Sequence, residues 1–327
     1  MSDIQTILDF GEKKRNKNAL FTFIDLFAGI GGTRLGFESA GGECIYTSEW
    51  DPHSQKTYFA NFGDFPDGDI TKVKASDIPD FDVLLAGFPC QPFSSIGKRQ
   101  GFKHATQGTL FYDVARIIEE KKPRSFLLEN VPGLVTHDKG NTFKVILEAL
   151  NTLGYNVSYK ILDSSKFGVP QQRKRMYIVG FRKDLVPDDF EFEYPVGTND
   201  KVYINRFLEE GAEGYGISER LQKSYIYKLD DGRPMVVDKN SKIHVKTLVA
   251  SYHKIQRLTG TFVKDGDTGL RLFTQSECKA IMGFPKNFVV PVSRTQMYRQ
   301  FGNSVVVPVI SAVAKQMAKQ LGQSIAI

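Results

Sequence analysis

The segment that decides the fold reads Phe21-Thr22-Phe23-Ile24-Asp25-Leu26-Phe27-Ala28-Gly29-Ile30-Gly31-Gly32. Its bulky apolar residues are typical of a buried β-strand, and its glycines permit the tight turn that leads into a helix. Backbone N–H groups at the start of that helix are suited to contacting a bound ligand. The glycine spacing differs from G-x-G-x-x-G, and the Lys-Ser/Thr of a phosphate-binding loop is missing. The segment therefore indicates a nucleoside-like ligand that has no pyrophosphate.

Strand-like and helix-like segments alternate after this first unit. Alternation of this kind predicts βαβ units and a mostly parallel sheet with helices on both faces, which is an α/β, Rossmann-like fold. Strands are expected at residues 21–27, 44–47, 83–86, 125–128 and 176–181, and helices at residues 33–40, 52–61, 110–120, 142–153 and 309–320.

Two acidic residues and a tryptophan follow the expected strands of the first half. Glu49 closes the second strand, where a carboxylate can bridge the two hydroxyls of a ribose. Trp50 offers a ring face to an adenine or to a positively charged sulfur. Asp69 is expected at the end of a third strand, as an acceptor for an adenine amino group. A nucleoside joined to a sulfonium-linked amino acid fits these side chains better than a dinucleotide.

A cysteine between two prolines follows the strand at residues 83–86, in Gly87-Phe88-Pro89-Cys90-Gln91-Pro92-Phe93-Ser94. Most buried cysteines are inert small hydrophobic residues. Here the prolines rigidify a loop at a strand end, where open α/β sheets place their sites. Glu129 follows the next strand, and Arg173 and Arg175 precede the last one. A thiol, a carboxyl group and two arginines at one sheet edge are suited to addition to an electron-poor ring.

The region after residue 182 changes in character. Residues 184–219 hold ten acidic against two basic residues, and residues 220–264 hold ten basic against three acidic. Short alternating stretches at 234–238 and 243–248 predict a small β-rich module with one basic surface. Two solvated faces of opposite charge explain the counts equally well.

The overall composition narrows the class of protein. The chain has 327 residues, a net charge of +6 and three cysteines, Cys44, Cys90 and Cys278, without metal-ligand spacing. We expect no disulfide framework, no metal site, no membrane span and a cytoplasmic protein. A basic chain is compatible with a nucleic-acid partner. Residues 1–20 are a polar lead-in.

The motifs together resemble the bacterial DNA cytosine-C5 methyltransferases of restriction–modification systems. The resemblance is carried by Pro-Cys-Gln at Cys90, Glu-Asn-Val at Glu129 and Gln-x-Arg-x-Arg at 171–175, in the order of that family. The remaining matching blocks are residues 25–32, 49–50, 68–71, 108–117, 271–285 and 300–308. The resemblance implies a large catalytic domain at 21–182 plus 271–327, with a small target-recognition domain inserted at 183–270.

The resemblance also implies a mechanism and a set of ligands. Cys90 would attack C6 of a cytosine flipped out of double-stranded DNA, Glu129 would contact N3 and the exocyclic amine, and Arg175 would hold O2, with Arg173 supporting the pocket. The methyl donor would be S-adenosyl-L-methionine. The implied cofactor contacts are Phe27, Ile30, Gly31, Gly32, Glu49, Trp50, Asp69, Ile70, Pro89, Leu110, Asn303, Ser304 and Val305.

The expected DNA contacts fall in two places. The loop after Cys90 is basic and contains glycine, as a phosphate-contacting lid requires. The small domain supplies a Thr-Leu pair at 247–248, which resembles a pair that recurs in the family. It also supplies several basic residues. The candidates are Ser94, Lys98, Arg99, Gln100, Thr247, Arg220, Lys254 and Arg257.

Two other functions compete with this hypothesis. A related enzyme that methylates cytosine in tRNA has the same motif set, but it is associated with a Cys-Phe-Thr tripeptide that this chain lacks. A DNA-binding regulator without turnover would not need Cys90, Glu129 and Arg175 together. We expect a monomer, which acts separately from a cognate restriction endonuclease.

Overall fold

The computed structural model describes residues 18–88 and 110–323. The expectations for residues 1–17, and those for Pro89, Cys90, Ser94, Lys98, Arg99 and Gln100, lie outside the described residues.

A six-stranded sheet, in the order β2-β1-β3-β4-β6-β5, forms the centre of the region predicted as the large domain and called so below. The pairs β1–β2, β1–β3 and β3–β4 are parallel, whereas β6 runs antiparallel to both β4 and β5. The carboxyl ends of the parallel strands therefore share one edge with the start of β6. The strands are β1 Phe21–Leu26, β2 Gly42–Ser48, β3 Val83–Ala86, β4 Ser125–Asn130, β5 Tyr155–Asp163 and β6 Lys174–Arg182.

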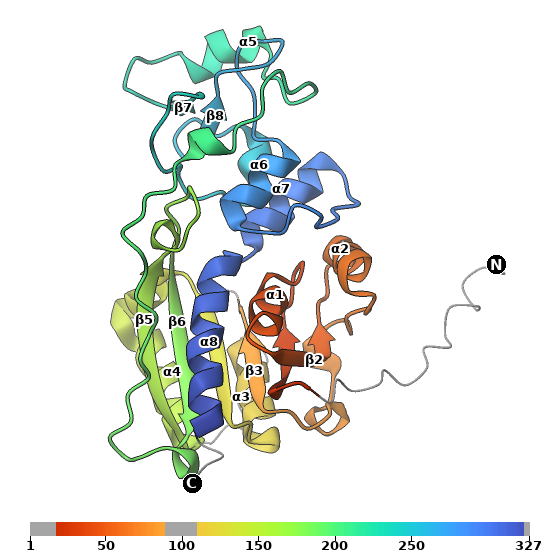
Figure 1. The fold of residues 1–327 in the computed structure, drawn as a ribbon, viewed down its shortest axis with the longest axis vertical. Coiled ribbons are helices and arrows are strands. Elements are labelled where there is room, and N and C mark those ends of the chain that lie inside the picture. The colour runs from red at the N-terminus through yellow and green to blue at the C-terminus, as the bar shows by residue number, and fades with distance from the viewer. Residues whose placement is uncertain (1–17, 89–109, 324–327) are drawn as a thin grey trace, which may run out of the picture.

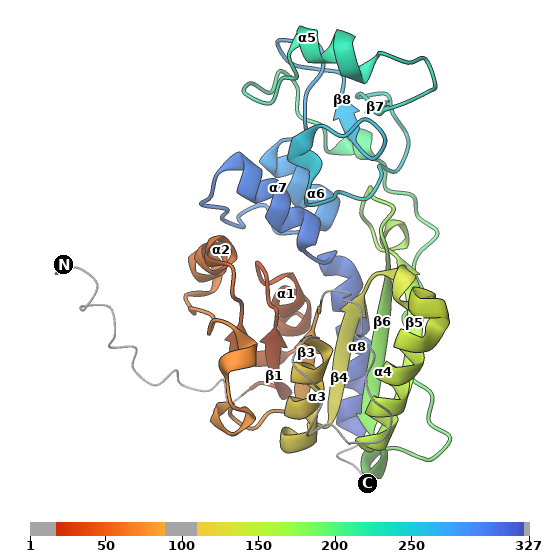
Figure 2. The ribbon, with the colours of Figure 1, turned by 180° about the vertical axis from the view of Figure 1, so that it is seen from behind.

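Helices cover both faces of this sheet. Helices α1 and α8 pack together on one face (Figure 1), and α3 and α4 lie on the other (Figure 2). Helix α2 lies near the end of β2, with Asp51 accepting from the Ser54 N–H as its N-cap and Pro52 in its first turn. The helices are α1 Gly32–Glu38, α2 Pro52–Phe62, α3 Leu110–Lys121, α4 Asn141–Thr152 and α8 Val307–Gln323.

The predicted α/β fold is confirmed, with two differences in detail. The expected third strand is wrong, because Asp67 makes a single bridge to Ser48 and Asp69 then caps a short 3₁₀ helix. Strand β5 was not predicted. It is an edge strand with an exposed stretch, so polar residues such as Ser158 and Lys160 interrupt its apolar pattern.

The region predicted as a small domain, residues 183–270 and called the small domain below, contains less strand than its alternating pattern predicts. Its described strands are β7 Met235–Val237 and β8 Thr261–Val263, which pair in parallel. The predicted stretch at 243–248 is irregular and makes one bridge, between Val245 and Gln171. The short helix α5, Glu219–Leu221, runs into a π-helical turn at Gln222–Ile226. Helices α6 Gln275–Met282 and α7 Arg294–Asn303 lie between this domain and the sheet (Figure 1).

Short 3₁₀ helices complete the connections. They are Ile70–Lys72, Ala75–Asp77, Pro132–Val135, His137–Gly140, Ser164–Lys166, Lys183–Leu185, Ile204–Arg206 and Tyr252–Lys254.

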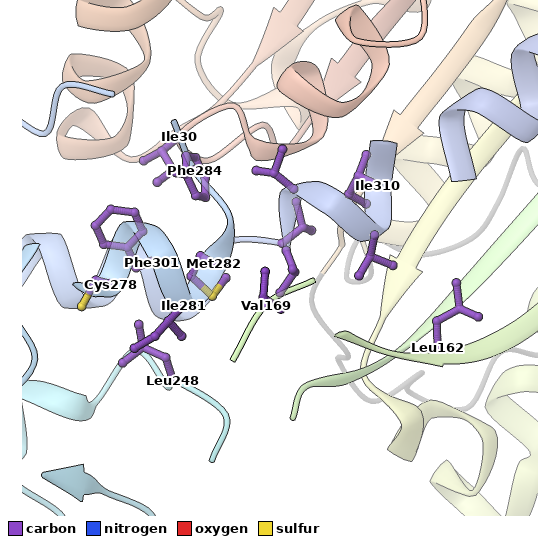
Figure 3. Packing of buried hydrophobic residues seen from close by; sticks show 14 of the residues in the cluster. Ile30, Leu162, Val169, Leu248, Cys278, Ile281, Met282, Phe284, Phe301 and Ile310 are labelled. Carbon is purple, nitrogen blue, oxygen red and sulfur yellow. The ribbon is translucent and has the colours of Figure 1, made fainter. Parts of the chain in front are cut away.

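One hydrophobic cluster continues from the large domain into the small one. Ile30 of the glycine turn and Ile310 of α8 belong to the same buried cluster as Phe284, Ile281 and Leu248. Figure 3 shows Leu248 of the small domain beside Ile281 of α6. The two domains therefore share apolar packing, which stabilises their relative placement.

A buried arginine organises the junction between α6 and the small domain. The Arg271 side chain has no exposed surface, and its guanidinium forms ion pairs with Asp265 at 2.9 Å and with Glu277 at 2.8 Å. It also donates to the backbone carbonyl of Glu209. Glu277 in turn caps α6 in a reciprocal capping box with Thr274. The buried charges of Arg271 and Glu277 are tolerated because each group has several hydrogen-bond partners.

Candidate active site

A cleft of about 850 Å³ opens at the sheet edge where the parallel strands end. It extends from the glycine turn to the start of β6 and to the segment between α7 and α8. The predicted residues that line it are Phe27, Ile30, Gly32, Glu49, Trp50, Asp69, Ile70, Leu110, Glu129, Arg173, Arg175, Asn303, Ser304 and Val305. The fold therefore brings together side chains that the sequence separates by up to 278 positions, from Phe27 to Val305.

The glycine turn is shaped by backbone geometry. Phe27, Gly29 and Gly31 have φ values of 57°, 56° and 83°, and the Gly31 N–H donates to the Ala28 carbonyl at 2.9 Å. A Cβ on Gly32 would lie 2.9 Å from Ser304 Oγ and 3.0 Å from Val305 Cγ2. Gly31 does not line the cleft, since its α-carbon faces the Phe62 ring. Its contribution is the left-handed turn that starts α1.

Glu49 holds the turn and the next segment in place. Its Oε2 accepts from the Gly29 N–H at 2.7 Å and its Oε1 accepts from the Asp51 N–H at 2.8 Å. Burial raises the pKa of Glu49, and these backbone donors oppose that shift. The carboxylate can accept about four hydrogen bonds, so it keeps acceptor capacity for a hydroxyl donor. Trp50 beside it is 77% exposed, so its ring face is available to a ligand.

Asp25 lies beneath this turn and is buried at the end of β1. Burial raises its pKa to about 8, although the positive charge of Arg34 opposes the shift. Its Oδ2 has no hydrogen-bond partner among the described residues. A neutral carboxyl group at this position avoids placing an unpaired negative charge in the core.

Glu129 and Arg175 form the polar centre of the cleft. The Glu129 Oε1 lies 3.1 Å from the Arg175 Nε, and both side chains are 17% exposed. Burial raises the pKa of Glu129, whereas the positive charges of Arg175 and Arg173 lower it. Glu129 is the last residue but one of β4 and Arg175 is the second residue of the antiparallel β6, so the strand directions bring them together.

Arg173 serves a different purpose from Arg175. Its guanidinium donates to the carbonyls of Leu248 at 2.9 Å, Gly302 at 3.0 Å and Ser304 at 2.7 Å. Burial and the neighbouring Arg175 lower its pKa to about 10, which keeps it protonated at neutral pH. It lines the cleft, but three of its donors are committed to backbone carbonyls. These contacts support the expectation that Arg173 maintains the pocket.

The predicted DNA contacts in the small domain separate into two groups. Arg220 and Lys254 are exposed, and the Thr247 Oγ1 donates to the Gln172 carbonyl. Arg257 differs from these residues, because its guanidinium is buried and donates to Asp231 and to the carbonyls of Ile226 and Leu229, so its expected DNA contact stays a prediction. Charge counting did not reveal that an acidic partner lies nearby.

Gln300 is a cleft residue that the sequence reasoning missed. Its side chain accepts from Thr57 Oγ1 at 3.0 Å and donates to the His53 carbonyl at 2.8 Å, which ties α7 to α2. Gln296 and Arg299 of the same helix also line the cleft. Helical spacing from Asn303 was the signal that could have identified them.

The described residues contain no cluster of acidic, histidine and cysteine side chains that fits a metal ion. Within the same ranges, none of the helices has the length and apolar character required to cross a bilayer.

The sheet and its cleft define an α/β protein of the Rossmann-like type, with a ligand cleft at the carboxyl ends of its parallel strands. The family model for C-5 cytosine-specific DNA methylases matches residues 21–319, and the chain belongs to that family. It is therefore a DNA cytosine-5 methyltransferase.

Sequence relatives agree with this assignment, and solved structures share the fold. The chain is 60% identical over 310 residues to the Type II methyltransferase M.BsuFI of Bacillus subtilis, a match that covers 94% of this chain and 75% of the relative. It is 57% identical over 319 residues to M.MspI of Moraxella sp, covering 98% and 75%. The S. pombe Dnmt2 methyltransferase structure has the same fold, with a TM-score of 0.73, 21% identity and coverage of 93% and 99%.

Proposed function

We propose that the enzyme binds S-adenosyl-L-methionine in the cleft and methylates C5 of a cytosine flipped out of double-stranded DNA, through a covalent Cys90 adduct. The observation that carries this proposal is the Glu129–Arg175 pair, placed in the same cleft as the glycine turn, Glu49 and Trp50. A ring held by this pair would face the ligand held by the turn.

The residues of the turn fit the proposed cofactor. The glycines leave the backbone close to the cleft, and the exposed Trp50 ring suits an adenine or a sulfonium. Glu49 retains acceptor capacity for ribose hydroxyls. When bound, this cofactor supplies an electrophilic methyl group.

The remaining chemistry belongs to the residues of the chain. The Cys90 thiolate would add to C6 of the cytosine, which breaks the C5=C6 double bond and moves its electron pair into the ring. Glu129 would give a proton to N3, which neutralises the added charge and leaves C5 as an enamine nucleophile. Arg175 donates to O2 and fixes the ring. After methyl transfer to C5, loss of the C5 proton expels Cys90 and restores the aromatic ring. The raised pKa of Glu129 keeps its carboxyl protonated to a higher pH than usual, which suits a group that shares a proton.

DNA enters this scheme through several expected contacts. Flipping a base costs a few kcal/mol, and the small domain and the loop at residues 94–100 would compensate through phosphate and base contacts. Arg220, Lys254 and Thr247 remain candidates for these contacts. We further propose that the enzyme acts as a cytoplasmic monomer and protects host DNA beside a separate restriction endonuclease, since its relatives are named Type II methyltransferases.

Bisulfite sequencing of plasmid DNA from cells that express the protein tests the proposal, with Cys90→Ala as the control variant. We expect protected cytosines in one short sequence context for the wild type and none for Cys90→Ala. Protection that persists in Cys90→Ala would remove Cys90 from the nucleophile role. Protection of tRNA cytosines alone would favour the tRNA enzyme, and DNA binding without any protection would favour the regulator.

A further inference from the structure

The Thr247–Leu248 segment of the small domain is fastened by two buried side chains to the residues that precede β6. Gln171 has no exposed surface; its Oε1 accepts from the Leu248 N–H at 2.6 Å, and its Nε2 donates to the Ile281 carbonyl at 3.1 Å. Arg173, two residues further along, donates to the Leu248 carbonyl. Both backbone polar groups of Leu248 are therefore held from the segment that leads to Arg175.

The same arginine also holds one wall of the cofactor cleft. Its second terminal nitrogen donates to the carbonyls of Gly302 and Ser304, at the end of α7 and the residue that follows. Ser304 and Val305 line the cleft and touch the glycine turn at Gly32. The Arg173 guanidinium thus joins Leu248 of the small domain to Gly302 of the cleft wall, which lies 54 positions later in the sequence.

The two joined segments are also in direct contact. A Cβ added to Gly302 would lie 2.1 Å from the Ala250 nitrogen and 2.3 Å from the Val249 carbonyl carbon. These are backbone atoms, which cannot swing aside as a flexible side chain does. Gly302 therefore allows the end of α7 to press against residues 249–250, and neither segment can move far without the other.

We propose that Arg173 and Gly302 form a junction that couples the position of residues 247–250, which begin at the expected DNA contact Thr247, to the position of the cleft-lining residues 302–305. Arg173 is then a positioning residue, and its role is to make binding of cofactor and binding of DNA mutually favourable. This inference rests on the proposed function, since it requires the cofactor to bind in the cleft and the small domain to contact DNA.

Gly302→Ala is the most direct test, with Gly322→Ala as its matched control. Both positions lie in helices, where alanine is intrinsically better than glycine by about 1 kcal/mol. An added Cβ at Gly322 meets nothing within 4 Å, whereas at Gly302 it meets backbone. Any specific effect at position 302 therefore reports the contact and not the helix.

The experiment measures the affinity of a DNA duplex with and without saturating S-adenosylhomocysteine. The duplex carries the sequence context in which the wild-type protein protects cytosines. We expect the ligand to tighten DNA binding about tenfold in the wild type and in Gly322→Ala, and less than about twofold in Gly302→Ala. Arg173→Lys should give an intermediate ratio, because one ammonium cannot span all three carbonyls. Linkage requires the same ratio when the order of ligands is reversed.

Several outcomes would overturn the inference. A folded Gly302→Ala protein, verified by its thermal unfolding midpoint, that keeps the tenfold ratio would show that the contact transmits nothing. A wild-type ratio of one would do the same while leaving the proposed reaction intact. If S-adenosylhomocysteine did not bind the wild type at all, both the proposed cofactor site and this inference would be rejected. A ligand that binds without changing DNA affinity would reject this inference alone.

Discussion

The large and small domains of this enzyme are stabilised in different ways. In the large domain, strand β3 is fully apolar and buried, β4 is buried except for the half-buried Glu129, and the sheet orders the chain around them. In the small domain the strands β7 and β8 have three residues each, and buried arginines hold irregular backbone in place. Apolar periodicity therefore specifies the first domain, whereas hydrogen bonds to backbone carbonyls specify much of the second.

The sharpest way to test this division is to exchange residues 183–270 with those of a relative that protects a different sequence. We expect the methylated sequence to change completely to that of the donor, because base contacts decide specificity and the cleft chemistry does not. Bisulfite sequencing measures the outcome. Retention of the original sequence context by a folded, active chimera would place base recognition in the large domain.

The substitution Glu129→Gln should affect catalysis and leave the small domain intact. We expect methyl transfer to fall by about 10²–10⁴-fold, because an amide cannot share a proton with N3 of the ring. Single-turnover transfer of labelled methyl groups measures this rate, and gel-shift DNA affinity should change little. A rate within threefold of the wild type would exclude Glu129 from proton transfer.

Arg271→Met should destabilise the junction of the two domains. The substitution leaves Glu277 buried without its cation, and breaking a buried ion pair costs about 3–5 kcal/mol. Urea unfolding monitored by circular dichroism measures the loss. Arg34→Met is a useful comparison, because Arg34 pairs with the partly exposed Glu38 and Asp64, and its loss should cost less. Equal losses would contradict the special role of Arg271.

The smallest expected effect concerns Arg257. Because its guanidinium is committed to Asp231 and to backbone carbonyls, Arg257→Met should leave the salt dependence of DNA binding unchanged. Lys254→Met, which removes an exposed charge, should reduce the slope of log K against log salt by about one if Lys254 contacts phosphate. A reduced slope for Arg257→Met would restore Arg257 as a DNA contact.

The same division explains what could be predicted from the sequence. Strand β3 was predicted to the residue because four apolar positions follow the acidic-rich turn and precede Gly87. Glu49, Glu129 and Arg175 were predicted because sheet topology gathers strand ends at one edge. Asp69 was wrongly placed at a strand end, since one bridge at Asp67 cannot be distinguished from a strand by composition. The role of Arg173 was expected, but the backbone carbonyls that Arg173 and Arg257 contact leave no mark in the sequence.

The antiparallel pairing of β4 and β6 has a consequence for tolerance to insertions and deletions. Glu129 lies opposite Tyr177 and Asn130 opposite Met176, so Arg175 begins one rung beyond the last pair. Removing a single residue between Arg175 and Phe181 would turn Arg175 to the opposite face of the sheet, because side chains alternate with period two. Removing two residues would leave Arg175 on its present face of the sheet but would shift it along β6 relative to Glu129. We therefore expect length changes within β6 to inactivate the enzyme in an odd–even pattern, unlike changes in the loops of the small domain.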